Sequence, residues 1–459
     1  MTLLKLPDDP TIDCAPLLTA ALASDNADVE VRGPHSIRAR VWALNRRNIK
    51  LWGDAVFTVI GPADPTKTGT PYDLSTEWYL GRSNRKHFTF KLCSGEIDGI
   101  QVVGQNIPAR FDGRFEFEHA FDFQSSSMKL KNAGARYVFG DGFELGDGVY
   151  VGEGGPCIDS VVDNFRAGPV GRQGGAVTHA TNTKITRYRS VDGTARSGLD
   201  IEPIGEGVVD GIEVAYCAIQ NTNLLGITSG GAGMVKNLWL HHNRLRVTGI
   251  PVLFFRSSVK TFQRGAHRVT DNTYTVGSST EPGLRANRLE SLEFSRNTVV
   301  CNGQGVAIIS AVQHTDAQDN VFYNAGGALT IPGAPGYKTP FLHRDSYVNP
   351  GQLVEVNNQY LAYTPEAQAK VKAFLDEWLA PPYKHPALYD MPLDLNTASF
   401  LMIADLPADK RGRRLGLKRA ALIQALAPNI RTLDDLEPLP LISRGVINAI
   451  RASNRTLQR

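Results

Sequence analysis

The segment Leu238-Trp-Leu-His-His-Asn-Arg-Leu245 carries a short pattern that returns along the second half of the chain. Two apolar residues stand two positions apart, a small polar residue follows, and another apolar residue comes two positions later. The pattern recurs about every 23 to 29 residues, a period typical of stacked units that cover one another's apolar faces. It predicts a solenoid. Its five copies are Ile212, Val214, Cys217, Ile219; Leu238, Leu240, Asn243, Leu245; His267, Val269, Asn272, Tyr274; Leu292, Phe294, Asn297, Val299; and Thr315, Ala317, Asn320, Phe322.

The alternation inside each copy is that of a β-strand, because successive side chains on a strand point to opposite faces. Leu238 and Leu240 are expected to point inward, and Trp239 and His241 outward. A helical repeat would need apolar residues at spacings of three and four, and these windows are too short and too rich in Gly, Asn and Thr. The repeating units are therefore predicted to be β-strands.

Four asparagines occupy the same position in successive copies: Asn243, Asn272, Asn297 and Asn320. An asparagine at a tight corner can bond to backbone groups, and stacked coils would align these side chains into a ladder. We interpret the four residues as structural. Cys217 stands at the same position of the preceding copy, where a small buried thiol would fit.

The composition is that of an ordered, soluble protein. Apolar residues make up 42% of the chain, and the net charge of +3 is too small to indicate a nucleic-acid partner for the whole of it. Five widely spaced cysteines without a CxxC pair predict neither a disulfide framework nor a zinc site. We find no signal-peptide pattern and no long apolar run, so neither general secretion by its own signal nor a membrane contact is expected.

Changes in pattern divide the chain into predicted parts. The repeat can be followed to about residue 330, and residues 61–95, with several Pro and Gly, are predicted to be a loop leaving the first coils. The predicted parts are 1–28, with a short capping helix; 29–363, the solenoid; 364–392, a helix and a Pro-rich linker; and 393–459, a small helical domain.

Two helices are predicted outside the solenoid repeat. Residues 13–23 place apolar side chains at helical spacing. Thr364-Pro365-Glu366 is a typical helix start, and the run to Leu379 keeps one apolar stripe. That stripe consists of Val371, Phe374, Leu375 and Trp378.

Three strands in the middle of the chain have unusual sequences: 146–152 (GDGVYVG), 172–177 (RQGGAV) and 197–203 (SGLDIEP). Aligning Gly148, Gly174 and Gly198 separates them by one coil each. This alignment predicts that the three segments are neighbours on one sheet.

The third segment carries two candidate catalytic carboxylates. If Leu199 and Ile201 face the core, Asp200 and Glu202 must both point outward. Alternate residues on a strand lie about 6.5 to 7 Å apart. Hydrolysis of a glycosidic bond with inversion uses two carboxyl groups about 6.5–9.5 Å apart, which leaves room for a water molecule.

Further candidates border this pair. Asp147 and Gln173 are predicted to lie on the two preceding coils, where they would orient the reacting groups, and Arg172 would bind a sugar carboxylate or lower the pKa of a neighbouring Asp. Acidic residues on a strand face often only solubilise it, but four polar groups converging on adjacent coils favour a site. Tyr150 is a candidate sugar-stacking platform, and Trp239 and Arg256, with Thr228, are expected to extend the groove.

The order DGVYVG, RQGG, SGLDIEP, followed by Asn-containing coils, resembles the right-handed parallel β-helix proteins of the pectate-lyase-like superfamily, especially bacterial and phage members such as tailspike depolymerases. The resemblance covers roughly residues 10 to 350. It implies an all-β, right-handed parallel β-helix with a polysaccharide groove along one sheet, and a homotrimer if the protein is a phage spike. It also implies that Asp200 and Glu202 take the family's acidic role. The epimerase motif DPHD and a calcium-binding cluster of three Asp are missing, which disfavours an epimerase or a lyase.

The tail has a second resemblance. Segments 393–399, 403–407, 431–436 and 447–450 resemble the helix-hairpin-helix domain of competence-type DNA-uptake proteins. In that family a Gly-hydrophobic-Gly hairpin presents backbone amides to phosphate. Both glycine pairs are missing here, and although 393–459 has 11 Lys and Arg against 6 Asp and Glu, we favour an assembly role over DNA binding.

Together these patterns predict a polysaccharide depolymerase that hydrolyses glycosidic bonds of a bacterial surface or exopolysaccharide, with no cofactor and no metal-ligating residues predicted, and they leave open whether a metal helps. The alternatives are a lyase acting on a uronic-acid glycan and a non-catalytic glycan-binding fibre or adhesin. We expect a phage tail or prophage origin, with the cytoplasm or a non-classical export route as the alternatives.

Overall fold

The computed structural model describes most of the chain up to residue 379 and a few residues beyond it. The described residues are 2–7, 9–60, 86–106, 109–113, 115–146, 155–190, 194–220, 225–231, 233–254, 263–277, 282–301, 307–310, 312–324, 341–344, 352–379, 436, 442–444 and 446–448.

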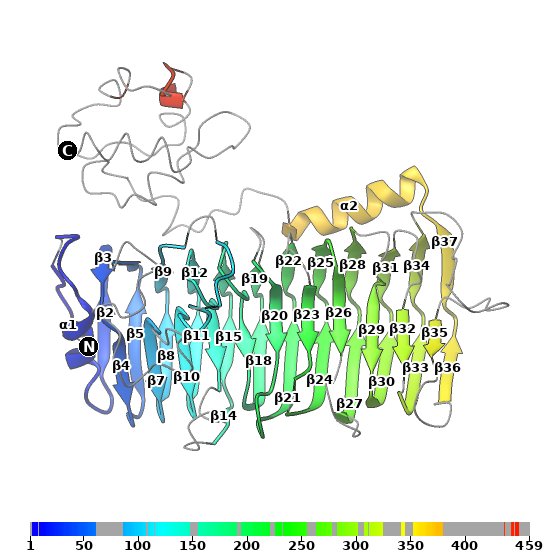
Figure 1. The fold of residues 1–459 in the computed structure, drawn as a ribbon, viewed down its shortest axis with the longest axis horizontal. Helices are drawn as coiled ribbons and strands as arrows, with labels where there is room; N and C mark the ends of the chain where they lie inside the picture. The colour runs from blue at the N-terminus through cyan, green and yellow to red at the C-terminus, as the bar shows by residue number, and fades with distance from the viewer. Residues whose placement is uncertain are drawn as a thin grey trace.

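Within these residues the chain winds through three parallel sheets in turn, so that each coil adds one strand to each sheet (Figure 1). Sheet A consists of β1 (Thr2–Leu3), β2 (Asp28–Val31), β5 (Ile49–Gly53), β8 (Ser94–Asp98), β11 (Ser127–Lys131), β15 (Val161–Asp163), β18 (Ala180–Thr186), β21 (Val208–Ala215), β24 (Met234–His241), β27 (Gln263–Thr270), β30 (Leu289–Ser295), β33 (His314–Gln318) and β36 (Gln352–Val356), with β14 (Cys157–Ile158) paired to β18.

Sheet B follows sheet A in each coil. It consists of β3 (Pro34–Ile37), β6 (Val56–Val59), β9 (Gln101–Val103), β12 (Gly134–Arg136), β16 (Arg166–Ala167), β19 (Arg189–Ser190), β22 (Ala218–Gln220), β25 (Arg244–Val247), β28 (Thr273–Val276), β31 (Thr298–Cys301), β34 (Val321–Asn324) and β37 (Gln359–Ala362).

Sheet C closes each coil. It consists of β4 (Val41–Leu44), β7 (Phe88–Lys91), β10 (Phe121–Gln124), β13 (Phe143–Leu145), β17 (Ala176–Val177), β20 (Ser197–Ile201), β23 (Leu225–Ser229), β26 (Ile250–Phe254), β29 (Leu284–Asn287), β32 (Ala307–Ser310) and β35 (Phe341–Arg344). The all-β solenoid predicted from the repeat is confirmed, and its strands form a parallel β-helix, as the family resemblance implied.

The core lies inside the three sheets and is filled by every second side chain of each strand. Leu238 and Leu240 are buried, as predicted, and Trp239 between them is 37% exposed. Identical side chains stack from coil to coil: the rings of Phe88 and Phe121 lie 5.5 Å apart on neighbouring strands. The period-2 alternation of the sequence therefore translates directly into one continuous apolar column.

The predicted asparagine ladder is present at the corner between sheets A and B. The side-chain oxygen of Asn272 accepts hydrogen bonds from the backbone N and from Nδ2 of Asn243, at 2.9 and 3.0 Å. Asn272 Nδ2 in turn donates to Leu240 O and to Asn297 Oδ1, both at 3.0 Å. The ladder continues through Asn320, and all these groups are paired inside the core, where an unpaired amide would be costly.

The ladder has one further asparagine that the repeat did not reveal. Asn320 N and Nδ2 donate to Asn358 Oδ1, so the last described coil keeps the same corner. Each ladder asparagine follows a residue with a left-handed backbone conformation, which turns the chain sharply from one sheet to the next. These residues are His242, Asp271, Arg296, Asp319 and Asn357, with φ between 53° and 58°.

Earlier coils fill the ladder position with apolar groups. Cys217, as predicted, is buried there, and its backbone N–H donates to Asn243 Oδ1 at 2.9 Å. In the two preceding coils Tyr188 and Phe165 take the position, with stacked rings 6.3 Å apart. The corner therefore changes from a hydrogen-bonded ladder to an aromatic stack while the coil geometry is kept.

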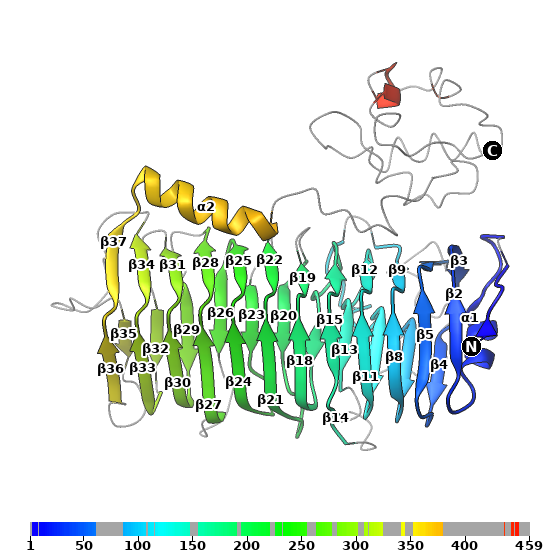
Figure 2. The ribbon, with the colours of Figure 1, turned by 180° about the vertical axis from the view of Figure 1, so that it is seen from behind.

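Two helices accompany the stack (Figure 2). α1 (Ala15–Ala21) buries Ala15 and Leu18 at the N-terminal end and confirms the predicted capping helix. α2 (Pro365–Leu379) lies against the outer face of sheet B, where Leu375 packs with Ala218 of β22 and Val300 of β31. None of the helices in the described part of the chain is long and apolar enough to cross a membrane.

An arginine anchors α2 to the sheet. The Arg244 guanidinium lies 3.8 Å from the ring centroids of both Phe374 and Trp378, and its Nη1 is 3.0 Å from Glu377 Oε2. Of the predicted stripe, Val371 and Leu375 are buried, whereas Phe374 is 46% exposed because it packs on the arginine rather than on the core.

One boundary differs from the sequence prediction, and the described coils extend further than the repeat could be followed. Within the predicted loop 61–95, residues 61–85 lie outside the described residues, but Phe88–Lys91 forms β7 because Phe88 and Phe90 both fill the core. The coils continue past residue 330, where the repeat could no longer be followed, to β37, which lies within the predicted solenoid 29–363. That last coil has Glu355 at an inward position, opposite Ala317, and this breaks the apolar pattern.

Replacing Asn272 by Ala is expected to lower the free energy of unfolding by about 1–3 kcal/mol for each buried group left without a partner. The amide groups of Asn243 would lose their acceptor, and Leu240 O would lose its donor. Urea titration monitored by circular dichroism measures the loss. The half-buried Asn287 of β29 provides a matched control, Asn287→Ala. Equal stability of the two variants would contradict the structural role of the ladder.

Candidate active site

The strand β20 carries the two predicted catalytic carboxylates. Leu199 and Ile201 are fully buried in the core, and Asp200 lies between them on the outer face of sheet C. Glu202 follows directly, and its backbone N–H donates to Val177 O at 2.9 Å, which keeps it in the register of the sheet. The predicted inward and outward alternation of this segment is confirmed.

Asp200 is held by side chains from both neighbouring coils. Gln173 Nε2 donates to Asp200 Oδ2, and Thr228 Oγ1 donates to Asp200 Oδ1. Thr228 pairs with Asp200 across the sheet, as expected for the next coil. Asp200 is only 7% exposed, so its charge is enclosed in a set of donors. Burial raises the pKa of its carboxyl, although the hydrogen bond from Thr228 opposes this shift.

Glu202 is the accessible member of the pair. Its side chain is 39% exposed, and Arg172 Nη2 lies 3.5 Å from its Oε2. Partial burial and the neighbouring charge of Asp200 raise the pKa of Glu202 to about 7. A carboxyl group that keeps its proton near neutral pH can act as a general acid.

The carboxyl groups of Asp200 and Glu202 are close enough to influence one another, since each is among the causes of the other's pKa shift. Two outward residues on one strand were expected about 6.5 to 7 Å apart. Across this short separation the charge of Asp200 acts on Glu202 and raises its pKa.

Arg172 is fixed from its other side by a carboxylate that the sequence prediction missed. Arg172 Nη1 lies 2.7 Å from Asp141 Oδ2, and the backbone N–H of Gln173 donates to Asp141 Oδ1 at 2.9 Å. Asp141 is completely buried. The site is therefore a chain of charges that runs from Asp141 through Arg172 to Glu202 and Asp200.

The alignment of Gly148 with Gly174 is wrong. Glu144 pairs with Ala176, and the backbone N–H of Gly142 donates to Gln173 O, so Gly142 is the neighbour of Gly174. Two Asp-Gly pairs occur close together, at 141–142 and 147–148. The sequence alignment assumed coils of regular length and therefore placed the second pair beside Gly174. The true coil is longer, with 32 positions from Gly142 to Gly174 instead of the predicted 26. Asp141 thus occupies the place predicted for Asp147.

Further buried charges lie beside Asp141 on the same face. His119 Nε2 is 2.8 Å from Glu144 Oε2, and the backbone N–H of Asp141 donates to His119 Nδ1 at 2.9 Å. Lys86 Nζ lies 3.0 Å from Asp122 Oδ1 and 3.4 Å from Glu144 Oε2. Asp122 and Glu144 each stand between two apolar residues in the sequence. This alternation could have predicted that both side chains point outward on this sheet.

Glycines bring the coils together next to the site. A Cβ on Gly174 would lie 2.4 Å from Gly198 O and 1.9 Å from the Tyr188 hydroxyl, and one on Gly142 would lie 2.4 Å from Gly174 O. Gly198 and Gly226 continue the column on the next two coils. The glycines of the unusual strands therefore serve close packing of the backbone rather than chemistry.

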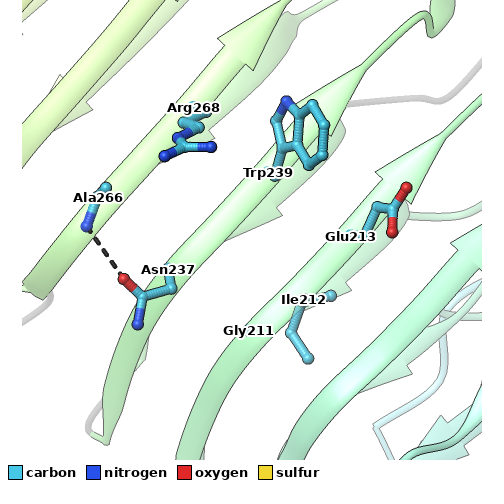
Figure 3. A pocket seen from close by; sticks show the side chains of 7 residues that line it. All are labelled: Gly211, Ile212, Glu213, Asn237, Trp239, Ala266 and Arg268. Carbon is cyan, nitrogen blue, oxygen red and sulfur yellow. Dashed lines mark hydrogen bonds between the residues drawn. The ribbon is translucent and has the colours of Figure 1, made fainter.

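The other predicted site residues do not join this cluster. Trp239 lies on sheet A, beside Glu213 and Arg268, because the segment around it forms the first strand of its coil and not the third (Figure 3). Its expected place in the same groove as Asp200 is wrong. Asp147, Tyr150 and Arg256 lie outside the described residues. In the part of the chain that is described, no cluster of three His, Cys, Asp or Glu side chains is arranged to hold a metal ion.

Replacing Arg172 by Met is expected to lower the free energy of unfolding by about 3–5 kcal/mol, because the buried Asp141 carboxylate loses its cation. Denaturant titration measures the change, and the exposed Arg38→Met serves as control. The double variant Asp141→Asn with Arg172→Met should regain part of the loss. A loss below about 1 kcal/mol in the single variant would contradict a structural ion pair.

Comparisons with known proteins give distant structural similarities. The endo-xylogalacturonan hydrolase from Aspergillus tubingensis is 10% identical with a TM-score of 0.47, over 79% of this chain and 93% of that chain. The catalytic unit of the GH87 alpha-1,3-glucanase from Streptomyces thermodiastaticus strain HF3-3 is 12% identical with a TM-score of 0.43, over 79% and 69% of the two chains. The surface adhesin PfbA of Streptococcus pneumoniae is 9% identical with a TM-score of 0.40, over 77% and 91%. No protein-family model matches this chain, and no curated protein matches it.

Proposed function

We propose that this protein is a polysaccharide depolymerase that hydrolyses glycosidic bonds of a bacterial surface or exopolysaccharide, with Glu202 as the general acid. One observation carries the proposal: on the face of a long sheet the partly exposed Glu202 carboxyl lies beside the buried Asp200 carboxyl and 3.5 Å from Arg172, and burial with the charge of Asp200 raises its pKa to about 7. Such a pair holds one proton at neutral pH and can deliver it to a substrate oxygen.

In the proposed reaction Glu202 donates its proton to the glycosidic oxygen, and the bond from the anomeric carbon to that oxygen breaks. Water adds to the anomeric carbon and returns one proton to the carboxyl pair, so that the pair is restored. Asp200 is a positioning residue, because its enclosed charge keeps Glu202 protonated. In this proposal the carboxyl groups of Glu202 and Asp200 act together as one acid–base unit. The sequence had suggested that one of them acts as the acid and the other separately activates water.

The surroundings of Arg172 favour hydrolysis over elimination. A lyase needs a cation that neutralises the carboxylate of the uronic acid, and Arg172 is already engaged by Asp141 and Glu202. The Arg172 side chain is also buried, with an exposed fraction of 8%. Its proposed task is to orient Glu202 rather than to bind a sugar carboxylate.

A non-catalytic glycan-binding protein is the second candidate. This candidate is favoured because the carboxylate oxygens of Asp200 and Asp141 already bind Gln173, Thr228 and Arg172, so they are not free to act on a substrate. Incubation with capsular polysaccharides and exopolysaccharides separates the candidates. New reducing ends indicate a hydrolase, unsaturated uronic-acid ends indicate a lyase, and binding without new ends indicates an adhesin.

Several expectations about the setting of this protein remain proposals: a phage-tail or prophage origin, assembly as a homotrimer, and an assembly role for residues 393–459. Asp147 and Tyr150 likewise stay predicted site residues, although the register that supported Asp147 favours Asp141. Size-exclusion chromatography with light scattering tests the homotrimer, and salt-dependent DNA binding tests the tail.

Replacing Glu202 by Gln is expected to lower kcat by about 100-fold or more, because the proton donor is removed. In the wild-type protein, kcat should fall as the pH rises through about 7, where Glu202 loses its proton. Asp200→Asn should move this fall to lower pH by about one unit or more, since the neighbouring negative charge is gone.

These profiles are measured as reducing ends released per unit time, with Asp98→Asn on sheet A as a matched control. The control should keep both the rate and the pH profile. Unchanged cleavage by the Glu202→Gln variant, with the fold intact, would exclude Glu202 as the acid.

The same pKa predicts how stability depends on pH. In the unfolded chain Glu202 loses its proton near 4.5, but in the folded protein it keeps the proton up to about 7. The wild-type protein should therefore lose stability relative to Glu202→Gln as the pH rises from 4.5 to about 7, and no further above that. Urea titrations of both proteins across this window measure the difference. A constant difference would show that the pKa is not raised.

A further inference from the structure

A hollow on the outer face of sheet A lies apart from the carboxyl pair. Its volume is about 290 Å³, and β21, β24 and β27 contribute its walls (Figure 3). The lining residues are Gly211, Ile212, Glu213, Asn237, Trp239, Ala266 and Arg268. The proposed reaction on sheet C uses none of these residues.

A column of left-handed residues inside the strands produces the hollow. Asn182, Gly211, Asn237 and Gly265 have φ between 48° and 77° on four successive strands of sheet A. Strand pairing shifts register there, between Lys236 and Trp239. Asn237 Oδ1 accepts a hydrogen bond from Ala266 N at 3.2 Å, which fixes the bend. Bulges of this kind re-aim side chains on the sheet surface.

Trp239 presents one ring face to the hollow. Its other face is covered by His241, whose ring lies 4.0 Å away at an interplanar angle of 30°. Asn237, two residues before Trp239 on β24, and Ala266 on the neighbouring β27 line the hollow together with Trp239 (Figure 3). The indole N–H donates to Thr270 Oγ1 at 3.2 Å, which holds the ring in place, and 37% of the side chain is exposed. A fixed aromatic face next to polar groups is suited to a sugar ring.

Polar side chains flank this ring on both neighbouring strands. Glu213 precedes Trp239 and Arg268 follows it in the same row across the sheet. Glu213 is oriented by Lys184 and by His241, each at 3.1 Å. Arg268 is only loosely paired, with its Nε 3.6 Å from Glu293 Oε2 and a half-exposed side chain. A carboxylate and a guanidinium on either side of an aromatic face can bind sugar hydroxyls as acceptor and donor.

A second hollow continues the first along the stack. The two share Ala266 and Arg268, and the second reaches Asp316 on β33. Together they cross five strands, which lie about 4.8 Å apart. Their charged side chains are Glu213, Glu293, Asp316, Arg268 and Arg296, so carboxylates slightly outnumber guanidinium groups. This balance favours an uncharged chain with many hydroxyl groups over an anionic one.

We propose that this track on sheet A is a binding site for an uncharged polysaccharide strand, with Trp239 as the stacking platform. The site is independent of the Asp200–Glu202 pair and would hold a long polymer on the protein whatever the chemistry on sheet C. Trp239 thus keeps the sugar-binding role expected from the sequence, but on a different face of the β-helix.

The test uses the full chain with Glu202→Gln, so that no polymer is degraded during the measurement. Affinity electrophoresis in gels containing laminarin, xylan or dextran, and separately polygalacturonate or alginate, gives dissociation constants. Binding to at least one neutral polymer is expected, and Trp239→Ala should weaken it about three- to tenfold or more. Trp239→Phe should retain most of the affinity because an aromatic face remains.

Trp52→Ala is the matched control. Trp52 lies on the same sheet, near the N-terminal end, where its indole N–H donates to Asp28 Oδ1 at 2.7 Å. This variant should bind as the parent does. Equal affinity of Trp239→Ala and its parent, binding of the acidic polymers alone, or no binding to any polymer would each overturn the proposal. Failure of the hydrolase proposal would appear instead as unchanged cleavage by Glu202→Gln, with sheet A binding unaffected.

Discussion

Successive coils stack in one register, and the rest of the structure depends on this constraint. A parallel β-helix has no closed core in a single coil, so each strand is buried only if the next coil places an apolar residue beside its own. At the corner between sheets A and B the constraint is most severe, because polar backbone groups are enclosed there. The asparagine side chains pair these groups from coil to coil, and each bond requires the next coil to be in position.

The same register creates the candidate active site. Asp141, Arg172, Gln173, Asp200 and Thr228 come from four coils, and they meet because stacking sets them side by side. Glycines next to these strands let the backbones approach. Burial then tunes the chemistry: Asp200 is enclosed by donors, and its charge together with partial burial holds the proton on Glu202. On sheet A the register shifts locally, and the bulged strands leave a track beside Trp239.

Most of the fold and part of the site could be predicted from the sequence, for physical reasons that also explain the errors. Alternation around Leu199 and Ile201 fixed the outward direction of Asp200 and Glu202, and the period placed Gln173 beside them. A period alone does not tell which of three sheets a strand joins, so Trp239 was expected on the wrong face. Asp141 was missed because the coil from Gly142 to Gly174 is 32 residues long, longer than the regular period that the prediction assumed. The repeat pattern could not be followed into the last coil because Glu355 interrupts its apolar pattern.

The central claim is that coil stacking produces a carboxyl pair in which Glu202 keeps a proton near neutral pH. Carbon-13 NMR of protein labelled at the glutamate carboxyl carbons, with the signal assigned through Glu202→Gln, measures this pKa directly. The account predicts a titration near 7 in the wild-type protein and a lower pKa in Asp200→Asn. A wild-type Glu202 that titrates at its ordinary value of 4.5, unaffected by Asp200→Asn, would contradict it.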